Sequence, residues 1–257
     1  MYVTINDITL YYEKYGNKKF NILILPGWGN TRKTFNYMIN FLKNFATIYI
    51  IDFPGFGKTK FPSRDLTIYD YANLIKDFIS YNSISNYAII SHSFGTRISL
   101  ILCGMLNSLN DKLIIIDGAG IKEKKKLHDK IKTIIYKILK KLKILLPRKI
   151  KNKYLNKLNS IFGSTDYNNL DNKMKNTFIK VVNEDLTYLL RNIKQETLLI
   201  WGENDLDTPL ESGKIMEQLL DNGTLITLKN TGHFSYLENP VLVNKIIFEF
   251  LKNDFNL

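Results

Sequence analysis

Short runs of apolar residues, each followed by polar or small residues, recur along both ends of the chain. Six of them are four or five residues long and predict strands, and the continuously apolar ones are expected to be buried on both faces of a sheet. Two weaker runs, residues 3–5 and 9–15, alternate apolar and polar positions and predict a pair of edge strands. Buried strands are predicted at residues 21–25, 47–51, 87–90 and 197–200, and two further strands at residues 112–116 and 224–228.

Segments with apolar residues at helical spacing separate these strands. Because strands alternate with helices, the pattern predicts an α/β fold with a mostly parallel, doubly wound sheet. Ligands of such sheets bind at the carboxyl ends of the strands, so the loops that follow the strands are the places to search for chemistry. Helices are predicted over residues 31–43, 68–81, 211–220 and 241–251, and in the segment after Ser93 that contains Ile98, Ile101, Leu102 and Met105.

The alternation stops between residues 121 and 192. Apolar residues there recur at helical spacing with lysines between them, which predicts an amphipathic basic helix that Pro147 ends. A second helical block is predicted from Met174 to Leu190. We interpret residues 121–192 as an inserted α-helical cap over the carboxyl edge of a core formed by residues 1–120 and 193–257. The apolar positions of the first helix are Ile131, Ile134, Ile135, Ile138, Leu139, Leu142 and Leu145.

The formal net charge of +12 is concentrated in this insertion. Residues 121–160 hold fifteen lysines and arginines against two acids, so the remainder of the chain sums to −1. A solvated face on a helix that packs on the core is the favoured interpretation, and no nucleic-acid partner is expected. Weak contact of the basic cap with a membrane surface is the alternative.

Other features of composition are ordinary for a globular protein, with 45% hydrophobic and 23% charged residues. Cys103 is the only cysteine, so no intramolecular disulfide can form and a reducing compartment, the cytoplasm, is expected. The N-terminal residues show no signal-peptide pattern, and no uncharged apolar run is long enough to span a bilayer.

Ser93 stands at a sharp change from strand to helix. An apolar run ends at Ile90, the residues Ser91-His92-Ser93-Phe94-Gly95 follow, and a helical pattern begins at once. A tight turn of this kind lifts a serine hydroxyl above the sheet, and the first free N–H groups of the helix lie beside it. Ser91 replaces the first glycine of the usual G-x-S-x-G pattern. The turn predicts a nucleophilic serine, with an incidental serine in a strand–turn–helix as the alternative.

Four motifs in the right order make the chain resemble the α/β-hydrolase family over nearly its whole length. They are Pro26-Gly27-Trp28-Gly29, Asp52-Phe53-Pro54-Gly55-Phe56-Gly57, the turn at Ser93, and Gly202-x-x-Asp205-x-x-x-Pro209 followed by Gly232-His233. The family's usual His-Gly in the first loop is Pro26-Gly27 here. The resemblance implies an α/β-hydrolase fold and a Ser-His-Asp triad in the chain order nucleophile, acid, base.

The base is predicted from the chain's three histidines. His92 adjoins the nucleophile and should point away from it, and His128 lies in the lysine-rich segment. His233 follows a core strand in a loop, so it is the predicted base.

The acid is predicted at Asp205, which matches the family position after the penultimate strand. Asp207, two residues on, is a candidate helix N-cap or loop stabiliser. Asp117, which ends the strand after the nucleophile helix, is the rival for the acid.

Two backbone N–H groups are expected to form an oxyanion hole. One belongs to Phe94, the residue after the nucleophile, and the resemblance assigns the other to Trp28. The loop from Asp52 to Gly57 is interpreted as scaffold. No phosphate-loop spacing and no cluster with metal-ligand spacing occurs, so neither a metal nor a cofactor is expected.

The resulting hypothesis is a carboxylesterase-like serine hydrolase with a small-molecule acyl substrate and an acyl-enzyme intermediate. Two alternatives stay open. One is a carbon–carbon bond hydrolase or lyase of a dienoate-like substrate, for which Arg97 and the cap lysines are candidate anion partners. The other is a non-catalytic binding module on a hydrolase scaffold.

Overall fold

A computed structural model describes residues 1–108, 110–122, 139, 147, 150–151, 154 and 170–255. The chain divides into two compact units, one formed by residues 1–122 and 180–257 and the other by residues 123–179. The predicted basic helix around Ile131–Leu145 and His128 lie outside the described residues, Leu139 excepted. The insertion boundaries at 121 and 192 and the position of the cap over the core stay predictions.

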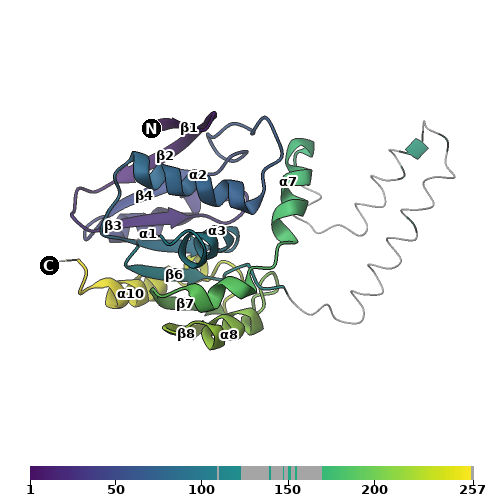
Figure 1. Ribbon diagram of the computed structural model, residues 1–257. Helices are drawn as coiled ribbons and strands as arrows, with labels where there is room; N and C mark the ends of the chain where they lie inside the picture. The colour runs from purple at the N-terminus through teal and green to yellow at the C-terminus, as the bar shows by residue number, and fades with distance from the viewer. Residues whose placement is uncertain are drawn as a thin grey trace. The chain divides into compact units, whose positions relative to one another are not determined.

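The first unit is built on one eight-stranded sheet with the order β1-β2-β4-β3-β5-β6-β7-β8 (Figure 1). β2 pairs antiparallel with β1 and with β4, and every other neighbouring pair is parallel. The predicted mostly parallel, doubly wound sheet is therefore confirmed. The strands are β1 (Tyr2–Ile5), β2 (Ile8–Tyr15), β3 (Asn21–Leu25), β4 (Thr47–Asp52), β5 (Tyr87–His92), β6 (Lys112–Ile116), β7 (Glu196–Gly202) and β8 (Gly223–Leu228).

Most of the helices coincide with the predicted segments. Residues 31–43 form a 3₁₀ turn and a helix rather than one continuous helix, and α9 was not predicted. The helices of the first unit are η1 (Arg32–Phe35), α1 (Asn36–Leu42), α2 (Ile68–Tyr81), α3 (Phe94–Gly104), η3 (Thr187–Asn192), α8 (Leu210–Leu219), α9 (Ser235–Glu238) and α10 (Pro240–Leu251).

The continuous apolar runs arise because both faces of the sheet are covered. In β5, Tyr87 and Ile89 pack into the hydrophobic cluster on the side of α2, α3 and α8. Ala88 and Ile90, which alternate with them, pack into the cluster on the side of α1 and α10. Each residue of the strand therefore meets apolar neighbours whichever way its side chain points.

The predicted helical block from Met174 to Leu190 is wrong as one element. α7 spans Asn172–Val182, and η3 begins only at Thr187. Arg97 binds the carbonyl oxygens of Val182 and Glu184 at 3.2 and 2.7 Å, so these carbonyls are directed to a buried guanidinium instead of a following helical turn. Asp185 Oδ1 also accepts hydrogen bonds from the backbone N–H and hydroxyl of Thr187, a local turn that competes with helix.

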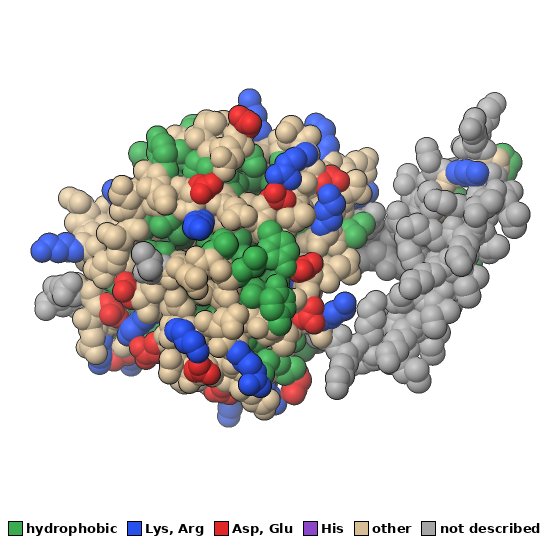
Figure 2. Space-filling model, in the orientation of Figure 1, with side chains coloured by type: hydrophobic (Ala, Val, Ile, Leu, Met, Phe, Trp, Pro, Cys, Tyr) green, Lys and Arg blue, Asp and Glu red, His purple; other side chains and the backbone are tan. Residues whose placement is uncertain are grey.

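Acidic and basic side chains are interspersed over the visible face of the first unit (Figure 2). This mixture fits the near-neutral sum of charge outside residues 121–160. Among the described residues, none of the helices combines the length and apolar character required to cross a bilayer.

Candidate active site

Ser93 occupies a strained turn between β5 and α3. Its backbone angles are φ 47° and ψ −114°, a region that side chains other than glycine rarely adopt. The turn is fixed from both sides: the Ser93 N–H donates to Ile116 O at 3.2 Å, and the Ser93 carbonyl accepts from the N–H groups of Thr96 and Ala119. Strain of this kind is held only where surrounding contacts determine the conformation, so the turn presents the hydroxyl at a defined place.

Gly95, two positions after Ser93, must be small because the backbone of α3 passes close to that of β3 here. A Cβ on Gly95 would stand 2.1 Å from the Leu25 carbonyl oxygen and 2.8 Å from that of Pro26. The start of α3 therefore rests directly on the end of β3, where the first loop begins.

Ser91, the departure from the usual pattern, is fully buried within a chain of hydroxyl groups. Its Oγ lies 3.1 Å from Ser99 Oγ and 3.3 Å from both Thr96 Oγ1 and Ile114 O. The additional hydroxyl is thus hydrogen-bonded, which explains how the strand accepts serine at this position.

His233 joins the hydroxyl and the carboxylate that the sequence selected. Its Nε2 lies 2.9 Å from Ser93 Oγ, and its Nδ1 lies 2.9 Å from Asp205 Oδ2. Burial lowers the pKa of His233, but the hydrogen bond and charge of Asp205 outweigh burial and leave this pKa raised above its ordinary value of 6.5. With a proton on Nδ1, Nε2 is left to accept the proton of Ser93.

Asp205 is 4% exposed and fully engaged by hydrogen-bond donors. Oδ1 accepts the backbone N–H groups of Asp207 and Thr208, each at 2.9 Å, and Oδ2 accepts the Thr208 hydroxyl at 2.7 Å in addition to His233. Burial raises the pKa of Asp205, yet His233 and these donors lower it overall. The carboxylate is therefore ionised. Pro209 is the N-cap of α8, so the suggested N-cap role of Asp207 is wrong.

Asp117, the rival acid, binds other partners. Its Oδ1 accepts the Gly202 N–H at 2.8 Å, and its Oδ2 accepts the N–H and hydroxyl of Ser235 at 3.0 and 2.7 Å. It thus joins the start of the Asp205 loop to the residue two positions after His233. Burial raises the pKa of Asp117 to about 7.

His92 contacts the backbone of His233, the predicted base. The ring is fully buried, and its Nε2 lies 2.8 Å from the carbonyl oxygen of His233. Burial and the neighbouring His233 lower the pKa of His92 to about 3, so the ring is neutral and its Nε2–H donates. Glu238 accepts the N–H of Gly232 at 2.9 Å. Both contacts fix the backbone on which His233 stands.

The two residues expected at the oxyanion hole lie side by side. The rings of Trp28 and Phe94 meet edge to face with centroids 5.0 Å apart, and Phe56 packs on Trp28 in the same way at 4.9 Å. Phe94 begins α3, so its N–H has no partner within the helix and stands at the positive end of the helix dipole. The backbone donor assigned to Trp28 stays a prediction.

Arg97 is not free to bind an anionic substrate. It is 8% exposed, and its guanidinium donates to the carbonyl oxygens of Val182 and Glu184. Burial lowers the pKa of Arg97 to about 10. The structure therefore assigns Arg97 to the attachment of the segment after α7, which corrects its candidacy as an anion partner.

Asp205, Asp207 and His233 place ligand-type atoms within 4.8 Å of one another. Both oxygens of Asp205 and the Nδ1 of His233 are occupied by the hydrogen bonds just described, so we assign no metal to this group.

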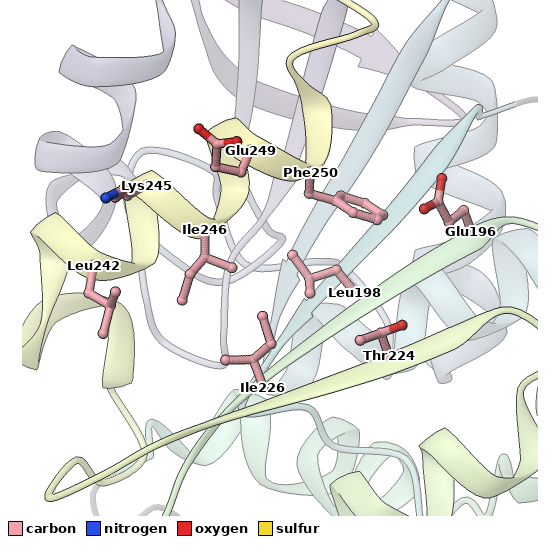
Figure 3. Close-up of a pocket in the computed structure, with 9 residues that line it drawn as sticks. All are labelled: Glu196, Leu198, Thr224, Ile226, Leu242, Lys245, Ile246, Glu249 and Phe250. Atoms are coloured by element: carbon pink, nitrogen blue, oxygen red, sulfur yellow. The ribbon is translucent and has the colours of Figure 1, made fainter.

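A separate groove of about 430 Å³ lies between α10 and the strands β7 and β8 (Figure 3). Ser93, Asp205 and His233 do not line this groove. Its lining includes Glu196, which lies at the opposite end of β7 from Gly202. Its residues offer no serine or cysteine beside a base. The lining consists of Glu196, Leu198, Thr224, Ile226, Leu242, Lys245, Ile246, Glu249 and Phe250.

Sequence reasoning missed the contacts of Thr208 and Glu238. The weak signal for Thr208 was its place three residues after Asp205, a spacing at which a hydroxyl and a carboxylate often meet in a turn. No local signal marks Glu238.

Comparison with known proteins agrees with the fold. A sequence profile of the alpha/beta hydrolase fold matches residues 21–240. The uncharacterized hydrolase YugF of Bacillus subtilis is 27% identical, over 97% of this chain and 96% of its own. The pimeloyl-[acyl-carrier protein] methyl ester esterase of Wigglesworthia glossinidia brevipalpis is 25% identical, over 92% of this chain and 95% of its own. The solved esterase of Exiguobacterium antarcticum superposes with a TM-score of 0.75 at 20% identity, over 98% of each chain.

Proposed function

Because the chain belongs to the α/β-hydrolase family, we propose that it is a serine hydrolase that cleaves carboxylic esters through an acyl-enzyme intermediate. One observation carries the proposal: His233 lies within hydrogen-bond distance of both the Ser93 hydroxyl and the buried Asp205 carboxylate. A nucleophile, a base and a group that orients the base are the parts that acyl transfer requires.

In the first half of the reaction, Nε2 of His233 takes the proton of Ser93 as Oγ attacks the ester carbonyl carbon. The oxyanion that forms is held by the Phe94 N–H and, as predicted, by the Trp28 N–H. The imidazolium, stabilised by Asp205, then gives its proton to the departing alkoxide. The acyl group is left on Ser93.

In the second half, water takes the place of the alcohol. His233 removes a proton from water, the hydroxide attacks the acyl carbon, and the proton returns to Ser93 as the carboxylic acid leaves. Asp205 stays ionised throughout, because its four hydrogen-bond donors favour the charged form.

Two considerations support an ester with an apolar acyl group as the substrate. The aromatic rings of Trp28, Phe56 and Phe94 pack together at the loop beside Ser93. Relatives named for ester cleavage include the pimeloyl methyl ester esterase and, at 23% identity, a mouse monoacylglycerol lipase. A dienoate-like substrate is less well supported, because Arg97 is occupied by backbone carbonyls.

Labelling with a fluorophosphonate probe tests the proposal, because the probe reacts only with an activated serine. We expect labelling at Ser93 and hydrolysis of p-nitrophenyl esters, with Ser93→Ala abolishing both; the loss of turnover should reach about a millionfold. Ser80→Ala, an exposed serine on α2, is the matched control and should label normally. Absence of labelling in the folded wild-type protein would leave the non-catalytic binding module as the better interpretation.

A further inference from the structure

Thr208 places its hydroxyl at the junction of the acid, the base and the neighbouring strand. Oγ1 lies 2.7 Å from Asp205 Oδ2, 3.0 Å from the carbonyl oxygen of Asp117 and 3.2 Å from His233 Nδ1. The backbone of Thr208 is fixed as well, because Trp201 Nε1 donates to its carbonyl oxygen at 2.7 Å.

A hydroxyl carries one proton, so the Asp205 carboxylate and the Asp117 carbonyl oxygen compete for it. Both the Asp205 carboxylate and the Asp117 carbonyl accept, but the charged acceptor at the shorter distance forms the stronger bond. The proton therefore goes to Asp205 Oδ2, and an oxygen lone pair remains toward the Nδ1–H of His233 at 3.2 Å, the long limit for such a bond.

We propose that Thr208 is a positioning residue that tunes the base, by donating to the same carboxylate oxygen that binds His233 and so reducing the negative charge that this oxygen offers to the imidazole. The effect of Thr208 on turnover rests on the proposed function, whereas its effect on the pKa of His233 does not.

The direction of the effect follows from the electrostatics. Asp205 favours the protonated form of His233, so removing one donor from Asp205 exposes more of its charge to the ring and raises the proton affinity of the base. Losing the Thr208 lone pair beside Nδ1–H acts in the opposite direction, but that contact is 3.2 Å long and weaker than the 2.7 Å hydrogen bond to the carboxylate, which sets the sign. Because only neutral His233 can accept the Ser93 proton, the hydroxyl keeps more of the base active near neutral pH.

Other groups near His233 must be considered in the same titration. His92 lies against the ring with centroids 4.9 Å apart, and it stays neutral. Three acidic groups act on the His233 ring: Asp205 and Asp207, in the loop after β7, and Asp117, directly after β6. A change at Thr208 that keeps the backbone in place removes a hydrogen bond from Asp205 and leaves His92, Asp207 and the Asp117 carboxylate unchanged.

The experiment compares the wild-type protein with Thr208→Val, which keeps the shape but removes the hydroxyl, and Thr208→Ser, which keeps the hydroxyl. The pKa of His233 is measured by NMR from its ring Cε1–H signal, assigned with a His233→Gln variant; the chain contains three histidines. The pH profile of kcat/KM on a p-nitrophenyl ester is recorded in parallel.

We expect Thr208→Val to raise the pKa of His233 by about half to one pH unit, with the acidic limb of kcat/KM moving by the same amount. Thr208→Ser should restore the wild-type value. A merely structural threonine would lower stability or activity without moving this pKa, and an unchanged or lowered pKa in Thr208→Val overturns the proposal.

Two further outcomes are distinguishable. If Thr208→Val does not fold, Thr208→Ala removes the same hydroxyl with a smaller side chain and is judged by the same shift. If no ester is hydrolysed and no probe labels Ser93, the proposed function fails, while the NMR titration still decides the role of Thr208.

Discussion

Gly95→Ala is the substitution for which the structure gives the sharpest expectation. Gly95 lies in the first turn of α3, where alanine on propensity alone would stabilise the helix by about 0.5–1 kcal/mol. The new methyl group, however, would meet the Leu25 carbonyl oxygen at 2.1 Å, the Leu25 carbonyl carbon at 2.7 Å and the Pro26 carbonyl oxygen at 2.8 Å. All three atoms belong to the backbone, so no side-chain rotation relieves the overlap.

The clash makes Gly95→Ala destabilising, although helix propensity alone would make it stabilising. Forcing an extra methyl group into a close-packed site costs about 1–3 kcal/mol, so we expect a net destabilisation of about 1–2 kcal/mol. For a chain of this size that corresponds to a fall in melting temperature of roughly 2–8 °C.

A backbone shift at Leu25 and Pro26 should also lower the catalytic rate. Leu25 ends β3, and the loop that carries Trp28 follows directly, so a shift at Leu25 and Pro26 moves the predicted Trp28 donor. Loss of one oxyanion donor reduces kcat on the order of 10²–10³-fold.

Thermal unfolding followed by circular dichroism, with ester hydrolysis on the same sample, checks both expectations. Ser80→Ala is the control, since it introduces alanine at an exposed helical position and should leave the melting temperature and activity near those of the wild type. A Gly95→Ala variant as stable as the wild type would refute the close approach of α3 and β3.

Two further predictions concern the base and its acid. Asp205→Asn should reduce kcat by about 10⁴-fold, because the amide no longer stabilises the imidazolium or selects the Nδ1–H tautomer; steady-state kinetics on a p-nitrophenyl ester measure this, and near-normal activity would indicate that Asp117 serves as the acid. The kcat/KM of the wild-type protein should decline as pH falls, with its midpoint above 6.5, because the pKa of His233 is raised and only neutral His233 accepts a proton. A midpoint below 6.5 in the pH–rate profile would contradict the assigned contact with Asp205.

Much of the fold was determined by local patterns. The continuous apolar runs at Ile22–Leu25 and Ile48–Ile51 have no polar face, and runs this short favour strands that are covered on both faces. The tight turn at Ser93 and the helical spacing after it were likewise visible, because a change of period from strand to helix is a property of neighbouring residues.

The candidate site was predicted in part. Ser93 was chosen because it stands at the turn from strand to helix, and His233 because it is the one histidine of three in a loop that follows a core strand. The choice between Asp205 and Asp117 was left to resemblance, since both follow a strand and both are carboxylates. Only the register of β6 and β7 and the partners of each carboxylate show that Asp205 meets His233.

Other features depended wholly on contacts between distant segments. Arg97 binds carbonyls more than eighty positions along the chain, Ser91 finds its partners on β6 and α3, and Thr208 reaches both Asp117 and His233. Periodicity reports which face of an element is buried, but it carries no information about which polar atoms meet there. Those partners are set by the angles and registers at which the elements pack, and so the tertiary structure alone decided them.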